Sequence, residues 1–516
     1  MTRPSFARIS SRSYLTFVLL LCLGFTVFSP TNADAQVNAS IKGTVSDATG
    51  ALISGASVVL RNTDTNLSRA TTTNDAGYYS IPDVLTGNYE LKVSKQGFRT
   101  AVQSGITLGV NQTAVFDLSL PTGSTTETVS VQASAVALET ATSELGVAVT
   151  RREVNDLPLN GRNFTQILNL TPGVSTVNVA QNAPSAGGIW SNPVGTSSYP
   201  SVNGQSNRSN LFLLDGVNNQ GSFGSTYAVA PIVDDIQEFK VQSHNDDASF
   251  GGVLGGVVNV VTKSGTTQYH GAAWEFLRNT TFDAANPFLN KVTPFQQNQF
   301  GASFGGPLWL PGQHGQKKTF FYLSYEGYRN HTAASNFYNT PTSQQLAGDL
   351  TSTVGTGQIY NPFSGQAFMC DGAGNPLPAP GNVQGAGVPC NKIPSTMINQ
   401  NMVTYAQTLF PAPNLTGNSK FNGLDTTKSI TRQDTGSGRL DHQFGQHDDV
   451  WARYTSFRQP ASGSGGFAGL FHNQVTDGYN VAVHYTHLFS GTTLAEFHFG
   501  RTSEYRSRLQ LYQCLA

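Results

Sequence analysis

The segment Gln299-Phe300-Gly301-Ala302-Ser303-Phe304-Gly305 alternates without a break between apolar residues and polar or small ones. Successive side chains of a strand point to opposite faces, so the two phenylalanines and the alanine share one face. A strand with lipid on one side and a water-filled lumen on the other requires this division. Residues 299–305 therefore predict a strand of a transmembrane β-barrel.

Six further segments show similar alternation, which gives seven predicted strands in all. The six lie at residues 270–276, 320–326, 438–444, 450–455, 481–489 and 494–499. Their connections alternate in length: 279–298, 328–436 and 456–480 are long, whereas 306–318, 445–449 and 490–493 are shorter. Bacterial barrels have short periplasmic turns and long external loops. We therefore expect residues 266–516 to form part of an antiparallel transmembrane β-barrel; a soluble sandwich would alternate too, but does not predict this rhythm.

The composition agrees with a mainly β protein. Only 12% of the 516 residues are charged, against about 25% in a typical soluble protein. The chain has 53 glycines. Its net charge of −1 argues against nucleic-acid binding, which needs an excess of basic residues. With 38% hydrophobic residues and no long charge run, the composition also argues against disorder.

The N-terminus predicts export. Arg3, Arg8 and Arg12 precede an apolar run at 14–28, and Ala33-Asp34-Ala35 follows it. This order is typical of a secretory signal peptide, here residues 1–35 with cleavage after Ala35. A membrane anchor is the alternative, but the run of about 15 residues is shorter than the roughly 20 needed to span a bilayer.

Three cysteines remain after that cleavage. Cys370 and Cys390 flank a loop rich in glycine and proline, and in an oxidising compartment a disulfide between them is expected. Metal binding is the rival interpretation, but neither histidine nor a third cysteine flanks the pair. The loop between predicted strands places this disulfide outside the cell. Cys514 is left unpaired.

Residues 37–120 contain short alternating strands separated by glycine turns. Their spacing predicts a small antiparallel β-sandwich. The segments that carry the detail are Gly43-Thr44-Val45, Gly55-Ala56-Ser57-Val58, Asp75-Ala76-Gly77-Tyr78-Tyr79, Gly87-Asn88-Tyr89 and Gly97-Phe98. They resemble the carboxypeptidase regulatory-like domain, which has a carbohydrate-binding-like fold. No zinc constellation accompanies them, and both a spacer role and sugar binding stay open.

A Ser/Thr/Gly-rich linker at 121–150 contains one extended, alternating segment, residues 127–133. Such a segment can be captured by strand addition to the sheet edge of another protein. It can equally be the last strand of the sandwich, and the local sequence is compatible with both.

Residues 151–265 predict a compact mixed α/β unit. Phe164, Ile167 and Leu168 have helical spacing, and Thr171-Pro172-Gly173 ends the helix. Strands are expected at 210–214, 236–241 and 256–262, with Asp215-Gly216 as a turn.

Four motifs of this unit together indicate a family. They are Leu157-Pro158-Leu159-Asn160-Gly161-Arg162-Asn163-Phe164, Leu214-Asp215-Gly216-Val217, Asp235-Ile236-Gln237-Glu238-Phe239, and the run from Gly255 to Gly265. In this order they resemble the plug of TonB-dependent outer-membrane receptors, in the Oar-like branch that carries a regulatory-like sandwich at its N-terminus. The resemblance implies a receptor of the Gram-negative outer membrane, in contact with its lipid, with the sandwich in the periplasm.

The same resemblance assigns roles. The segment of Glu127, Thr128, Val129, Ser130, Val131, Gln132 and Ala133 is similar to a Ton box, which pairs with the energy-transducing protein TonB. The implied function is energy-coupled uptake of an external small ligand, oligosaccharide or peptide. The alternatives are a surface adhesin or carbohydrate-binding protein that does not transport, and a nonfunctional fragment.

Seven strands are few for this family, because plugged transporters use about 22. We therefore expect a C-terminally truncated product, with Cys514 in an out-of-frame tail. Unpaired strand edges in a bilayer are costly, so the chain is expected not to assemble alone.

Neither an enzyme, a cofactor nor a metal site is expected. His484 and His487 are three residues apart in a predicted strand and fall on opposite faces. Asp234, Asp235, Asp246 and Asp247 are expected to be solvated loop carboxylates. The sequence shows no nucleophile elbow, P-loop or catalytic carboxylate pair.

Overall fold

The computed structural model describes residues 38–512, except 125–127, 133–144, 158, 160–161, 163, 176–199, 207–208, 222–226, 245–252, 286–291, 293, 310–316, 355–356, 379–386, 417–419, 446, 465–469 and 491–492. The predicted signal peptide, Glu127, Ala133, Asp246, Asp247 and Cys514 lie outside the described residues. None of the described helices is both long and apolar enough to cross a membrane.

The N-terminal domain is a two-sheet sandwich around an apolar core that includes Ile41, Val58, Leu91 and Leu108. One sheet contains β4 (Tyr78–Val84), β1 (Ala39–Asp47), β7 (Thr113–Val115) and β8 (Leu118–Leu120). The other has the order β3 (Ser68–Thr72), β2 (Ser57–Asn62), β5 (Gly87–Ser94), β6 (Thr100–Leu108) and β9 (Thr128–Gln132).

The expectation of an antiparallel sandwich at residues 37–120 is wrong at two pairings, and a third parallel pairing adds a strand of the predicted linker to the sandwich. Strand β1 is parallel to both β7 and β8, and β6 is parallel to β9. The chain crosses from one sheet to the other between paired strands, and such crossovers bring strands together in the same direction.

The plug is built on a five-stranded sheet. Its order is β10 (Leu145–Thr150), β15 (Ile236–His244), β16 (Val257–Thr262), β13 (Leu211–Leu214) and β14 (Val217–Asn218). The three strands predicted here are confirmed. The predicted helix is instead the seven-residue 3₁₀-helix η2 (Phe164–Leu170), a form that is typical of short connecting segments. A further helix, α2 (Arg151–Asp156), starts where the N–H of Thr150 donates to the Glu153 carboxylate at 2.7 Å. The described plug also has the pair β11 (Val174–Ser175) and β12 (Ser201–Val202), and η5 (Val233–Asp235).

All seven predicted barrel strands are present in one antiparallel sheet. Its order is β17 (His270–Asn279), β18 (Phe295–Pro307), β19 (Thr319–Tyr338), β22 (Gly423–Gln443), β23 (Asp448–Ser464), β24 (Leu470–Ser490) and β25 (Thr493–Tyr512). We call it the barrel sheet.

The barrel strands are longer than predicted. β19 has 20 residues and β22 has 21, about twice the 9–11 that cross a bilayer. The predicted connections 328–436 and 456–480 are therefore partly strand, which corrects their bounds. Outside the lipid neither face needs to be apolar, so the backbone ladder continues where the sequence alternation stops.

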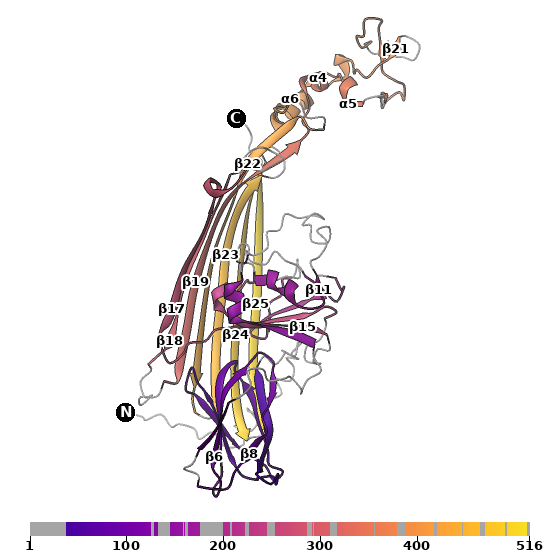
Figure 1. Ribbon diagram of the computed structural model, residues 1–516. Helices are drawn as coiled ribbons and strands as arrows, with labels where there is room; N and C mark the ends of the chain where they lie inside the picture. The colour runs from indigo at the N-terminus through magenta and orange to yellow at the C-terminus, as the bar shows by residue number, and fades with distance from the viewer. Residues whose placement is uncertain are drawn as a thin grey trace, which may run out of the picture.

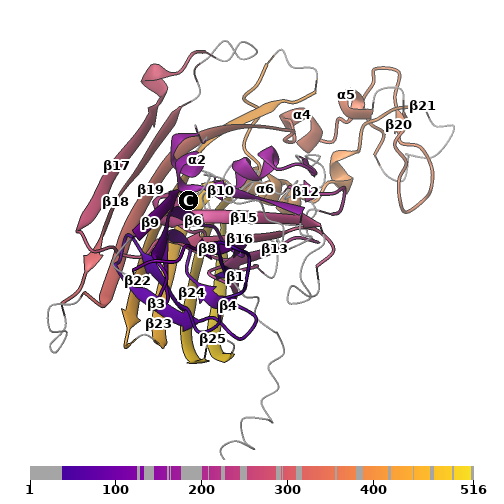
Figure 2. The same ribbon diagram turned by 60° about the horizontal axis from the view of Figure 1, so that its bottom comes forward.

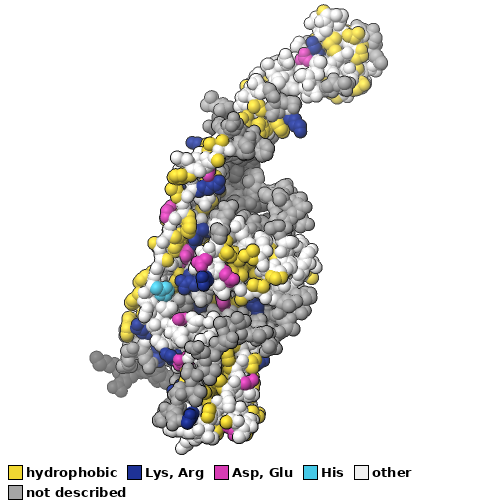
Figure 3. Space-filling view, in the orientation of Figure 1, with side chains coloured by type: hydrophobic (Ala, Val, Ile, Leu, Met, Phe, Trp, Pro, Cys, Tyr) yellow, Lys and Arg dark blue, Asp and Glu magenta, His cyan; other side chains and the backbone are white. Residues whose placement is uncertain are grey.

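The two faces of the barrel sheet differ as the alternation predicted. On β24, Thr476, Asn480, His484 and Thr486 are buried beneath the plug and sandwich. On the opposite face large apolar side chains are exposed, among them Phe304, Leu323, Tyr454 and Phe497, and Figure 3 shows hydrophobic side chains along the outer strands.

The sandwich, the plug and a long excursion between β19 and β22 occupy successive places along the barrel sheet (Figures 1 and 2). The sandwich sits at one end, and the plug lies against the face of the sheet further along. The excursion 339–422 extends from the other end with α4 (Ser343–Leu346), α5 (Thr351–Val354), β20 (Met369–Cys370), β21 (Val388–Pro389), η7 (Ser395–Met397) and α6 (Gln400–Leu409). It contains the Cys370–Cys390 disulfide, with the Cα atoms 5.7 Å apart.

Candidate functional site

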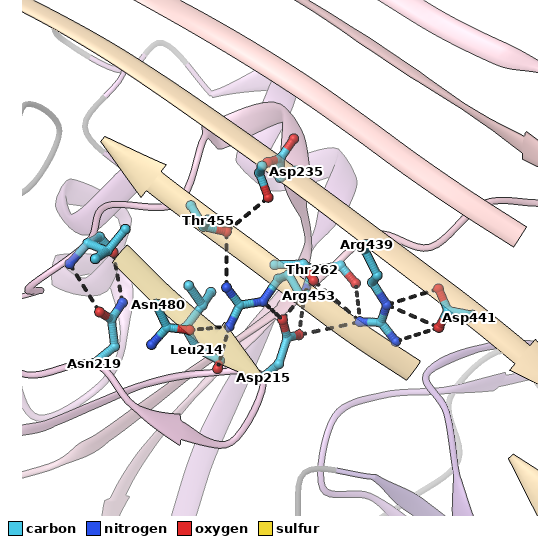
Figure 4. A network of polar contacts seen from close by, with 12 residues as sticks. Leu214, Asp215, Asn219, Asp235, Thr262, Arg439, Asp441, Arg453, Thr455 and Asn480 are labelled. Atoms are coloured by element: carbon cyan, nitrogen blue, oxygen red, sulfur yellow. Dashed lines mark hydrogen bonds and ion pairs between the residues drawn. The ribbon is translucent and has the colours of Figure 1, made fainter. Parts of the chain in front are cut away.

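The central contact between plug and barrel sheet is a buried ion-pair network around Asp215 (Figure 4). Asp215 follows β13 in the predicted turn, with φ at 48° and an exposed fraction of 2%. Its carboxylate accepts hydrogen bonds from the backbone N–H and the hydroxyl of Thr262, both at 2.8 Å. These bonds fix the carboxylate at the surface of the plug that faces the barrel sheet.

Two arginines of the barrel sheet converge on this carboxylate. Arg453 on β23 donates through Nε to Asp215, and its other nitrogens donate to Leu214 O at 3.2 Å, Thr455 Oγ1 at 3.0 Å and Asn480 Oδ1. Arg439 on β22 lies 3.5 Å from Asp215 Oδ1.

The second arginine has its own counter-ion. Arg439 donates from Nη2 to Asp441 Oδ1 at 2.9 Å and from Nη1 to Thr262 O at 3.2 Å. Its guanidinium also lies 4.5 Å from the centre of the Trp451 ring, a favourable cation–π distance. Two carboxylates thus balance two guanidinium groups, and the network is neutral overall.

The network keeps Asp215 ionised despite its burial. Burial alone would raise the pKa of Asp215, but Arg453, Arg439 and the hydrogen bonds from Thr262 outweigh it and hold this pKa below its usual value. The plug therefore presents a negative charge to a positive site on the barrel sheet.

A second polar contact joins η5 and the loop that contains Arg162 to β17, β18 and β19 of the barrel sheet. Arg162 pairs with Asp234 and lies 3.4 Å from Glu326 on β19, while its guanidinium lies 4.7 Å from the Phe276 ring centre. Glu326 in turn accepts from Trp274 Nε1 at 3.1 Å and from Gln299 Nε2 at 3.0 Å.

The aspartates of η5 correct an expectation. Asp235 is not solvated: it is 2% exposed and accepts from Ser324 Oγ at 2.6 Å, while Asp234 is partly buried and pairs with Arg162. Desolvation by burial raises the pKa of Asp235 to about 7. These carboxylates belong to the contact with the barrel sheet, which their loop position in the sequence did not indicate.

The sandwich also contacts the barrel sheet, at the end that carries the short turns. Arg69 pairs with Asp449 at the start of β23, and the Thr486 hydroxyl donates to Asp83. A cavity of about 160 Å³ lies where the three domains meet, lined among others by Arg69, Asp215, Arg439 and Asp449.

The Ton-box-like segment forms a strand of the sandwich. Thr128–Gln132 is β9 and pairs in parallel with β6, from Thr100 opposite Thr128 to Ser104 opposite Gln132. β9 ends the order of its sheet. Of the two interpretations left open by the sequence, the structure therefore shows the sandwich strand.

His484 and His487 fall on opposite faces of β24, as expected. His484 is 2% exposed and faces the sandwich, whereas His487 lies 2.7 Å from Asp448 on the other face. The importance of Arg439, Arg453 and Asp215 was missed by sequence reasoning. A charged residue at a lumen-facing strand position, such as Arg453 between Ala452 and Tyr454, is the signal that could have found them.

A sandwich, a plug and a barrel sheet in this order are the domains that the sequence motifs predicted, and comparison with known families identifies the class. Three family models match in sequence order: a carboxypeptidase regulatory-like domain at 40–121, a TonB-dependent receptor plug domain at 138–257 and an outer membrane beta barrel domain at 261–513. The chain belongs to the TonB-dependent receptors of the Gram-negative outer membrane and carries an N-terminal regulatory-like domain.

A curated relative is the TonB-dependent transporter Oar of Myxococcus xanthus, 25% identical over 291 residues, which are 52% of this chain and 25% of that protein. The chain thus matches about a quarter of that relative's length. Among solved structures, the alcaligin outer-membrane receptor FauA of Bordetella pertussis is 12% identical with a TM-score of 0.36, covering 74% of this chain and 51% of that one. A mutant of the ferric enterobactin receptor PfeA of Pseudomonas aeruginosa is 11% identical with a TM-score of 0.32, covering 70% of this chain and 42% of that one.

Proposed function

We propose that the chain acts in energy-coupled uptake of an external ligand across the outer membrane. In this proposal TonB pairs with residues 127–133 by strand addition, and force on this segment displaces the plug from the barrel sheet. The ligand, whether a small molecule, an oligosaccharide or a peptide, binds on the outer side of the plug and on the external loops.

The observation that carries the proposal is the nature of the plug contact. A plug that must leave the barrel sheet and return needs an interface that water can take over. The Asp215 network is polar and neutral, so separation leaves each charged group able to hydrate. Buried ion pairs contribute little net stability compared with apolar packing of the same volume, which suits a contact that has to open.

The strand order of the plug sheet supports an opening that begins at β10. β10 is an edge strand of this sheet, and among its strands it is the nearest in sequence to residues 127–133. Two strands, β15 and β16, separate it from β13, which leads to Asp215. Force that arrives through the linker therefore meets β10 first and the Asp215 network later.

Strand addition can be tested through the backbone. Replacing Val129 and Val131 by proline removes two backbone N–H donors, and we expect the double variant to lose binding of the purified periplasmic domain of TonB. The matched control, Val129→Ala with Val131→Ala, keeps both donors and should retain most of the binding. Equal binding by the proline and alanine variants would contradict the proposal.

Uptake needs a separate measurement in cells that make the protein. Deletion of residues 127–133 should abolish ligand uptake while the protein still reaches the outer membrane. Uptake that persists after the deletion, or that is unaffected by a protonophore, would contradict energy coupling.

A further inference from the structure

A cluster of potential metal ligands lies where the sandwich meets the barrel sheet. Asp83 is in β4 of the sandwich, His484 is on β24 and Glu496 is on β25. One carboxylate oxygen of each acid and one imidazole nitrogen all lie within 4.8 Å of one another. The cluster is separate from the Asp215 network and from the Ton-box-like strand.

The hydrogen bonds fix which imidazole nitrogen is available. The hydroxyl of Thr486 donates its proton to Asp83, so it must accept at its oxygen. His484 Nε2 lies 2.9 Å from this oxygen and supplies the proton. In the neutral ring Nδ1 then carries a lone pair.

That lone pair faces a carboxylate. His484 Nδ1 is buried, accepts no hydrogen bond from the described residues, and lies 3.5 Å from Glu496 Oε1. Two electron-rich atoms at this distance repel each other unless a positive charge lies between them. A single proton on Nδ1 or a metal cation would provide it.

The surrounding charges favour the metal cation. Asp83, Glu496 and the adjacent Asp449 contribute three negative charges, and Arg69, which is 3.8 Å from Asp83, contributes one positive charge. With His484 neutral, this group carries two excess negative charges. A divalent cation neutralises them, whereas one proton leaves one carboxylate unbalanced.

We propose that Asp83, His484 and Glu496 bind a divalent transition-metal ion such as Zn²⁺, which fastens the sandwich to the barrel sheet. One imidazole and two carboxylates suit Zn²⁺, Co²⁺ or Ni²⁺, while Ca²⁺ takes six to eight oxygen ligands. The ligands of a tetrahedral ion stand roughly 3.4 Å apart. Glu496 is already 3.5 Å from His484 Nδ1, whereas Asp83 is 3.6 Å from Nε2 and accepts from Thr486, so metal binding requires the Asp83 carboxylate to leave Thr486 and turn toward Nδ1.

A neighbouring histidine supplies a fourth position. The ring centre of His498 on β25 is 5.5 Å from that of His484, and its Nε2 is buried and makes no hydrogen bond within the described chain. The indole of Trp451 stacks on His484 at 5.3 Å and limits rotation of the imidazole. Rotation of His498 would complete a four-coordinate site.

Sequence reasoning compared His484 with His487 and expected no metal pair there. His484 and Glu496 lie on neighbouring strands, but Asp83 is about 400 positions away in the sequence, as the 403-residue separation of Thr486 and Asp83 illustrates. Their pairing follows from the docking of the sandwich, which the local pattern does not encode.

The test uses the full chain, purified in detergent without a histidine tag and stripped of metal. Titration with Co²⁺ should give one saturable site with the visible absorption of low-symmetry cobalt, and Zn²⁺ should displace it one to one. His484→Ala and the isosteric Glu496→Gln should each weaken Co²⁺ binding at least about 100-fold, since even outer-shell changes weaken metal binding by 10–100-fold.

The matched control is His487→Ala on the same strand. It removes a histidine from the opposite face and should bind Co²⁺ as the wild-type chain does. Each variant is checked for the wild-type strand signal in circular dichroism, so that loss of folding is not mistaken for loss of a ligand. Metal should also slow proteolysis between the sandwich and the plug in the wild-type chain but not in Glu496→Gln.

Three outcomes would overturn the proposal. One is the absence of a saturable site in the folded wild-type chain. Another is unchanged binding in folded His484→Ala and Glu496→Gln. The third is loss of binding in His487→Ala alone, which would move the ion to His487 and Asp448 on the outer face.

Discussion

Replacing Asp215 by asparagine tests whether the buried network holds the plug. The substitution keeps the size of the side chain but removes its charge. The oxygen that faces the Thr262 N–H is retained, whereas an amide nitrogen replaces the oxygen that accepts from Arg453 and from the Thr262 hydroxyl. Two N–H donors then oppose each other, and among the described residues Arg439 keeps its ion pair with Asp441 while Arg453 keeps none.

The expected magnitude follows from the burial of the network. Both Arg453 and Asp215 are at most 2% exposed, and removing one partner of a buried pair destabilises by about 3–5 kcal/mol. At 1.4 kcal/mol per factor of ten, local opening of the plug should become roughly one hundred to several thousand times more frequent.

Hydrogen exchange measures this opening directly. Protection of the amides in β13 and β16, including the N–H of Thr262, should fall by that factor in Asp215→Asn. The control is Asp477→Asn, because Asp477 pairs with Arg458 at 3.6 Å on the exposed surface and such pairs contribute at most about 1 kcal/mol. A loss of protection below about tenfold in Asp215→Asn, or an equal loss in both variants, would refute the reasoning.

A compensating pair separates charge from packing. Asp215→Leu combined with Arg453→Met removes the pair together and leaves Arg439 with Asp441 as its counter-ion. Apolar replacement of a whole buried pair is often neutral or stabilising, so this double variant should be better protected than Asp215→Asn. The plug of the double variant should also leave the barrel sheet less readily than the plug of Asp215→Asn.

Three further predictions concern other parts of the chain. Burial raises the pKa of Asp235 and of Glu238 to about 7. Because the pKa of each group is higher in the folded chain than in the unfolded chain, the two groups contribute fully to plug stability below about pH 4. This contribution is lost as the pH rises through 7. Exchange protection of the plug should therefore fall across this window, and Asp235→Asn should flatten the slope; a protection that rises with pH would contradict this. Reducing the Cys370–Cys390 disulfide, whose cysteines are 20 positions apart, should remove about 3 kcal/mol of loop stability. Proteolysis within 369–390 should then be faster, while hydrogen exchange in β22 and β23 stays unchanged. Equal cleavage before and after reduction would contradict this prediction. Finally, a free peptide of residues 127–133 should bind the periplasmic domain of TonB more tightly than the whole chain does, because the peptide offers both of its edges whereas one edge of β9 in the chain is paired with β6. Tighter binding by the whole chain would mean that the sandwich presents the segment rather than withholding it.

The barrel strands could be predicted from the sequence because two different solvents impose a period of two. In β18, Phe300 and Phe304 meet lipid while Gln299 and Ser303 meet the interior, and the sequence records this directly. β3 was missed because it has no such contrast: the residues of Ser68–Thr72 are all half-buried or exposed.

The plug contact could not be predicted in the same way. Lumen-facing positions are generally polar, so the alternation shows that Arg453 faces inward but not which group it meets. Asp215-Gly216 was predicted as a turn, and a turn residue is normally solvated. Only the docking of the plug turns this carboxylate into the counter-ion of two arginines that follow it by more than 200 positions.

The location of the charges connects the fold to the proposed function. Three ion pairs of this chain lie at domain contacts: Asp215 with Arg453, Arg162 with Glu326, and Arg69 with Asp449. At each contact the partners come from different domains, and each pair loses its attraction once water enters between the domains. The backbone ladder of the barrel sheet uses none of these pairs, so breaking them leaves the sheet intact. Under the proposed function, the plug can therefore part from the barrel sheet without breaking any backbone hydrogen bond of that sheet.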